Sequence, residues 1–241
     1  MNDSCKRKSF QGLRPTAKPL FENFSEARST KSETRAPSRV IITQADYQDM
    51  EKLARVQLAT TLPGPKPICL VGTRSARGES NLAPFSSVTH LGSSPLLIGM
   101  VSRPDTVERH TLSNILETKE WTLNHLTPGI MEAAHQTSAR YPREKSEFDA
   151  TNLTEHFHPG VHPPFVQESP ISYALKLVDL IEIPANNTRL IVGEVTHIEL
   201  PDGRLEADGR IDLEALDILS STGLDTYFSV KEIARLPYAR P

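Results

Sequence analysis

The chain has 241 residues, of which 37% are hydrophobic and 24% charged, so it holds enough apolar material for a globular core. Its net charge of -3 gives no indication of nucleic-acid binding, and no apolar run is long enough to span a membrane. Two cysteines are too few for a disulfide framework, and the N-terminus shows no secretory signal. We therefore expect a cytoplasmic protein without nucleic-acid or membrane partners.

Residues 1–40 differ in composition from the rest of the chain. They carry nine Lys and Arg against four Asp and Glu, and they lack the periodicity of a helix or strand. Such a segment is typical of a solvated arm or a disordered tail. We expect a basic N-terminal extension over residues 1–40 and one domain over residues 41–241.

The first half of the domain predicts strands after a short helix. Residues 44–62 predict that helix, which the sequence PGPKP ends. Residues 67–74 predict a strand in which Cys69 is a buried, inert thiol. Residues 81–92 predict a second strand, interrupted by polar residues and a proline, and residues 93–102 predict a third.

The next segments alternate between helix, strand and loop. Residues 106–118 place apolar residues at helical spacing, and residues 120–126 alternate as a strand does, with Trp121 in the core. Residues 129–141 predict a second helix. Residues 142–169 are long, polar and irregular, and a loop of this length in a domain is more often functional than idle.

Two long strands follow. Residues 171–183 and 188–200 show mostly two-residue periodicity, and the sequence PANN between them predicts a hairpin. The whole pattern is mainly β with short helices between strands. It favours a barrel or sandwich over a doubly wound fold.

Two segments offer a way to hold a nucleotide without a glycine-rich motif, since neither G-x-G-x-x-G nor G-x-x-x-x-G-K-[ST] occurs. In RHTLSN, Arg109, Thr111 and Asn114 surround the start of a predicted helix, which suits a phosphate. An N-capped surface helix explains the same residues. In NLAPFS, Pro84 indicates an edge strand or a bulge, with a backbone that a flat ring could approach. Taken alone, NLAPFS is also explained as a kinked strand.

Several ordered segments together resemble the flavin reductase-like, FMN-binding split-barrel family, which includes flavoredoxin-like flavoproteins. They are VGTRSARGESNLAPFSSVTHLGSSPLLIGMV, RHTLSNILETKEWTLNH, EAAHQTSARYPREKSEFDATNLT, ESPISYALKLVDLIEI and TRLIVGEVTHIEL. They cover roughly residues 60–200. Two departures from the family pattern are His110, where relatives often have an acidic residue, and Val88, where many have an aromatic one.

The resemblance implies a mainly β, six-stranded antiparallel Greek-key split barrel with short peripheral helices, forming a homodimer. It implies FMN rather than FAD as cofactor, and an NAD(P)H:flavin oxidoreductase that passes a hydride from NADH or NADPH through flavin N5. Some members pair with a partner oxygenase. The residues that it places at the cofactor are Arg74, Ser75, Asn81, Leu82, Ala83, Pro84, Phe85, Ser86, Ser102, Arg103, Arg109, Thr111 and Asn114.

The sequence leaves two other functions open: a non-catalytic FMN-binding electron carrier or flavin store, and a structural relative without flavin. No general acid or base is expected, because the cofactor carries the chemistry.

Three histidines lie in the long loop. The H-x-H spacing of His156 and His158 can place two imidazoles on one side of a strand, as a metal site requires. No cysteine or second cluster of carboxylates in the sequence supports a metal. We therefore expect His156, His158 and His162 to belong to a polar, proline-braced lid or to contact nicotinamide or substrate, and no metal ligand is predicted.

Overall fold

The computed structural model describes residues 39–104, 110–223 and 225–240. Residues 44–241 form one unit. The predicted extension over 1–40 lies almost wholly outside the described residues. No helix in the described ranges is long and apolar enough to cross a membrane.

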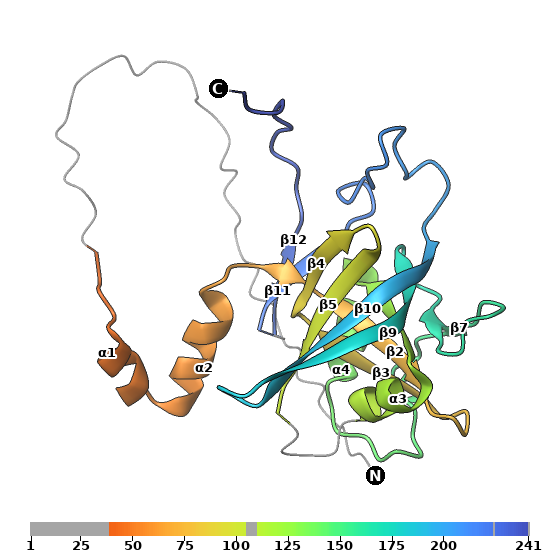
Figure 1. Cartoon of the computed structure of the whole chain (residues 1–241), viewed down its shortest axis with the longest axis horizontal. Helices are drawn as coiled ribbons and strands as arrows, with labels where there is room; N and C mark the ends of the chain where they lie inside the picture. Colours follow the sequence, from red (N-terminus) through yellow and green to blue (C-terminus); the bar gives the residue numbers. More distant parts are fainter. Residues whose placement is uncertain (1–38, 105–109, 224, 241) are drawn as a thin grey trace, which may run out of the picture. The chain divides into compact units, whose positions relative to one another are not determined.

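The helices are α1 (Gln44–Asp49), α2 (Lys52–Thr61), α3 (His110–Thr118), the 3₁₀ turn η1 (Pro128–Ile130), α4 (Met131–Gln136) and α5 (Glu147–Thr151). The strands are β1 (Lys66–Pro67), β2 (Cys69–Arg74), β3 (Ser80–Phe85), β4 (Val88–Ser93), β5 (Leu96–Ser102), β6 (Glu120–His125), β7 (Glu155–His156), β8 (Phe165–Val166), β9 (Ser172–Ile183), β10 (Thr188–Glu199), β11 (Leu219–Thr222) and β12 (Thr226–Ser229). Most of the strands gather in one body, and α3 and α4 lie beside it (Figure 1).

The main sheet is antiparallel throughout and has the strand order β3-β2-β6-β9-β10-β5-β4. Its first and last strands, β3 and β4, are consecutive in the chain. Only two residues separate Phe85 from Val88, so those strand ends can lie at most about 11 Å apart. The two edges therefore approach each other there, and the sheet must curl into a barrel that is split between β3 and β4.

This arrangement confirms the predicted mainly β split barrel and corrects the number of strands. The prediction of a single interrupted strand over 81–92 is wrong, because these residues belong to two strands at opposite edges of the sheet. β3 pairs with β2 as far as Phe85, and β4 begins a new pairing with β5 at Val88. The main sheet consequently has seven strands where six were expected.

The buried centre depends on a close approach between β6 and β10. Trp121 is 0% exposed, as predicted, and packs in one apolar cluster with residues of β2, β5, β9 and α3. A Cβ at Gly193 would lie 2.4 Å from Cη2 of this indole. Gly193 also follows a register shift between β9 and β10. Only a glycine therefore lets β10 pass this close to the ring.

Several predicted boundaries need correction. The helix expected over 44–62 is two helices, because the side chain of Glu51 accepts hydrogen bonds from Leu53 N and Ala54 N and starts α2 anew. The helix expected over 129–141 ends at Gln136. The predicted hairpin of β9 and β10 is confirmed. Near the C-terminus, β11 and β12 form a small sheet with β1 that was not predicted.

The segment 142–169 is less irregular than expected. It contains α5 and the β7–β8 pair, and the main sheet anchors its end. Thr122 Oγ1 donates to Pro164 O at 2.6 Å, and Val166 N donates to Asn124 Oδ1 at 3.0 Å. These buried bonds hold the second half of the segment against β6.

Candidate functional site

A cavity of about 540 Å³ opens beside the free edge of β3. Its walls come from β3 with the turn after it, the end of β5 with the start of α3, the residues after α4, and the start of α5. The lining residues of this β3 cavity are Asn81, 83–87, 101–103, 110–112, 137–141 and Glu147.

The β3 cavity brings together most of the residues predicted from the sequence. Asn81, Ala83, Pro84, Phe85, Ser86, Ser102, Arg103 and Thr111 all line it. Leu82 instead points into the core and is 0% exposed. Arg109 lies outside the described residues. The structure thus gathers two segments that are far apart in sequence around one space.

A buried hydrogen-bond network joins β3 to α3. Asn81 Nδ2 donates to Thr73 Oγ1 at 3.2 Å and to Thr111 Oγ1 at 3.0 Å. Asn114 Nδ2 also donates to Thr73 Oγ1, at 3.2 Å. Both Nδ2 protons of Asn81 are therefore used inside the protein. The amide thus connects β3 to α3, and a contact between Asn81 and a cofactor stays a prediction.

The backbone of β3 explains why its proline is tolerated. Leu82 N donates to Glu147 Oε2 at 2.9 Å, on the side away from β2. Alternate residues of an antiparallel strand direct their backbone groups to the same side. Pro84 therefore stands where an N–H would point away from β2, so its ring removes no bond of the ladder. The edge-strand interpretation is confirmed, while the β2–β3 pairing is regular and shows no bulge.

Glu147 is a site residue that the sequence did not reveal. It is the first residue of α5, follows the N-cap Ser146 and is only 7% exposed. Burial raises the pKa of its carboxyl, and the hydrogen bond from Leu82 N partly opposes that rise. Its only signal in the sequence is an acidic residue at a helix start, which is too common to mark a site.

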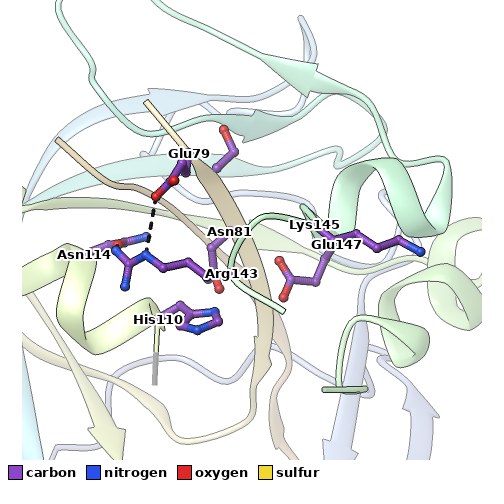
Figure 2. A pocket seen from close by; sticks show the side chains of 8 residues that line it. Glu79, Asn81, His110, Asn114, Arg143, Lys145 and Glu147 are labelled. Carbon is purple, nitrogen blue, oxygen red and sulfur yellow. Dashed lines mark hydrogen bonds and ion pairs between the residues drawn. The ribbon is translucent and has the colours of Figure 1, made fainter. Parts of the chain in front are cut away.

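A smaller pocket, the inner pocket, adjoins the β3 cavity. The two share Asn81, His110 and Glu147. Figure 2 shows Arg143 extending between Glu79 and Asn114 in this inner pocket. Arg143 Nε lies 3.4 Å from Glu79 Oε2, and its Nη2 donates to Asn114 Oδ1 at 3.2 Å. Asn114 is thus behind the cavity, where it holds a guanidinium.

Two arginines stand at the β3 cavity, and the sequence pointed to only one of them. Arg103 follows β5, and Arg140 follows α4; both side chains are exposed. Guanidinium groups bind phosphate through paired, charge-assisted hydrogen bonds. The segment around Arg140 was part of the resemblance, but helical periodicity had assigned it to a helix.

Arg74 and Ser75 lie elsewhere. Arg74 Nε donates to Gly78 O at 3.1 Å, and its guanidinium carbon lies 4.9 Å from the centre of the Phe157 ring. Ser75 Oγ accepts from Glu79 N at 3.1 Å. Within the described ranges, neither residue lines the β3 cavity or the inner pocket. Both close the turn between β2 and β3.

The fold and the cavity define an antiparallel split-barrel protein with a site at its open edge. The family described as "Flavin reductase like domain" matches residues 64–215. The chain therefore belongs to the flavin reductase-like family.

Solved structures agree with this assignment. A Shewanella frigidimarina protein, named as a flavin reductase with a split barrel domain, is 40% identical with a TM-score of 0.80, over 83% of this chain and 100% of that one. Nitrilotriacetate monooxygenase component B from Bacillus cereus is 23% identical with a TM-score of 0.73, over 83% and 99%. An FMN-binding protein from Thermus thermophilus is 21% identical with a TM-score of 0.60, over 72% and 90%. The last two are similar in fold.

Proposed function

We propose that this protein is an NAD(P)H-dependent flavin oxidoreductase that holds FMN in the β3 cavity. The observation that carries the proposal is the meeting of the open β3 edge with Ser102, Arg103 and Thr111 in one space. The flavin would supply the hydride chemistry at N5. The chain needs to bind the ring, orient it and hold its phosphate.

The donor set of the cavity fits a flavin mononucleotide. Its volume of about 540 Å³ falls within the usual range for ligand pockets, about 300–1,000 Å³. Its walls combine apolar groups, hydroxyls and cations, namely Phe85, Val101, Leu112, Ser86, Ser102, Thr137, Arg103 and Arg140. Apolar groups suit the ring, hydroxyls suit the ribityl chain, and guanidinium groups suit the phosphate. The name of the T. thermophilus neighbour supports FMN over FAD.

We also propose a homodimer. Apolar side chains are exposed on four neighbouring strands of the main sheet: Leu91 on β4, Leu96 on β5, Val178 and Ile181 on β9, and Ile198 on β10. Exposed apolar surface of this kind is typical of protein interfaces.

The name of the B. cereus neighbour supports a partner oxygenase as one destination of the electrons.

The visible spectrum of the full chain tests this function. After incubation with FMN and desalting, we expect the two visible flavin bands to remain with the protein. Anaerobic NADH or NADPH should then bleach them rapidly, and the faster donor identifies the nucleotide. Bound flavin that bleaches only with dithionite would favour the electron carrier. A protein that neither retains flavin nor turns over added FMN would overturn the proposal.

A further inference from the structure

A second cluster of chemically active side chains lies outside the β3 cavity. His156 Nε2 is 3.3 Å from Glu199 Oε1, and His158 Nε2 is 2.5 Å from the same oxygen. The three ligand atoms all lie within 4.8 Å of one another. Two imidazoles therefore converge on one carboxylate oxygen, although Glu199 lies 43 positions after His156 in the chain.

The backbone holds these residues in place from two directions. His156 belongs to β7 and pairs with Phe165 of β8, and the neighbouring Val166 is tied to Asn124 in β6. Glu199 ends β10, where it pairs with Ser172. Phe165 is 0% exposed, and its ring centre lies 6.3 and 6.0 Å from those of His156 and His158. Both sides of the cluster are therefore ordered by the fold.

The cluster is also accessible from outside. The side chains of His156, His158 and Glu199 are 37%, 41% and 30% exposed. A second cavity, of about 500 Å³, is lined by His156 and Glu199 together with Gln167, Ser169 and Pro170. An ion could enter without unfolding, and water or a small ligand could occupy the positions that the protein leaves open.

We propose that His156, His158 and Glu199 bind a divalent transition-metal ion, for which Zn²⁺ is the probe. Two imidazoles and one carboxylate suit such borderline metals better than Mg²⁺ or Ca²⁺. Zn–N and Zn–O bonds of about 2.0–2.2 Å in a tetrahedral site put neighbouring ligand atoms about 3.3 Å apart. The His156–Glu199 spacing already has that value, and His158 needs to move back by about 0.8 Å.

The ion would clamp the 155–166 segment to the end of β10, independently of any flavin. The sequence argued against a metal because neither a cysteine nor a second cluster of carboxylates supports one. The fold brings the carboxylate of Glu199 from a distant strand to the two histidines, which answers that objection.

Calorimetric titration of the untagged, chelator-treated full chain with ZnSO₄ tests the proposal. We expect one Zn²⁺ per chain and a higher melting temperature with the metal. His158→Ala and Glu199→Gln should each weaken binding at least tenfold. His90→Ala removes an exposed histidine from β4 and should leave binding unchanged.

Two results would overturn the metal site. One is a wild-type chain that binds no Zn²⁺, in which case the cluster is an ion pair only. The other is Zn²⁺ binding that His158→Ala and Glu199→Gln leave as tight as in the wild type. The metal-free melting temperature of each variant shows whether it folds, and His156→Ala replaces any variant that does not.

Discussion

Glu147 connects stability to the β3 cavity through a single carboxyl. Because burial raises its pKa above the ordinary value of 4.5, the folded state binds this proton more tightly than the unfolded state. Its contribution to stability is complete below pH 4.5 and is lost as pH rises through the raised pKa. Above pH 4.5, the burial of this carboxyl therefore opposes folding, while its oxygen accepts from Leu82 N.

Two variants separate these effects. Glu147→Gln keeps an acceptor without the charge, so we expect it to be more stable than the wild type at pH 7, with the difference shrinking toward pH 4. Glu147→Ala leaves the buried Leu82 N–H without its partner and should cost about 1–3 kcal/mol. Urea unfolding at several pH values measures both. A pH-independent difference between Glu147→Gln and the wild type would contradict the account.

Cys69 should be chemically silent in the native protein. It is 0% exposed, and burial raises the pKa of its thiol to about 12. Since the thiolate is the reactive species, almost none is present at pH 8. In a Cys5→Ser chain, we expect a thiol reagent such as DTNB to label nothing until denaturant is added. Rapid labelling of the native variant would mean that β2 opens easily.

Two arginines can be tested singly for a role at the phosphate, namely Arg140 from the β3 cavity and Arg109 from the family resemblance. We expect Arg140→Ala to weaken FMN binding by about 1–3 kcal/mol, because a charge-assisted hydrogen bond is lost. Arg109→Ala should have a similar effect, on the ground of the family resemblance. Arg77→Ala is the matched control, since this exposed arginine lies in the β2–β3 turn. FMN fluorescence quenching gives the affinities. If all three variants bind FMN as tightly as the wild type, the phosphate is bound by other residues.

At the scale of elements, β3 shows how one edge strand serves two purposes. Its inward groups pair with β2, and its outward groups face Glu147 and the cavity. Neighbouring positions of the strand should therefore respond differently to proline.

The matched pair is Pro84→Ala and Ala83→Pro. Pro84→Ala restores no ladder bond and loosens only the unfolded chain, so it should cost about 0.4–1 kcal/mol. Ala83→Pro removes an N–H directed at β2 and should cost about 3 kcal/mol or more. Denaturant midpoints compare the two. If the two substitutions lower the free energy of unfolding by similar amounts, the backbone nitrogen of Pro84 does not point away from β2.

At the scale of the whole molecule, the basic extension is expected to be dispensable for the fold. The matched family region begins at residue 64, well after residues 1–40. A chain lacking residues 1–35 should therefore keep its FMN affinity and its oligomeric state. Light scattering after size-exclusion chromatography, together with FMN titration, checks both. Loss of either would make the extension part of the domain.

The amino-acid sequence alone determined the features that depend on local pattern. Two-residue periodicity and the turn residues between 183 and 188 were sufficient for the β9–β10 hairpin. Helical spacing was sufficient for α3, and the interruption at Pro84 narrowed β3 to an edge strand or a bulge. These features are readable because neighbouring residues in the chain decide them.

Only the tertiary structure decided which distant residues meet. It placed β3 and β4 at opposite edges of one sheet and moved Glu147 and Arg140 to the wall of the β3 cavity. It also brought Glu199 to His156 and His158. None of these contacts leaves a local pattern, because each follows from how the curled sheet and the segment anchored on β6 pack together.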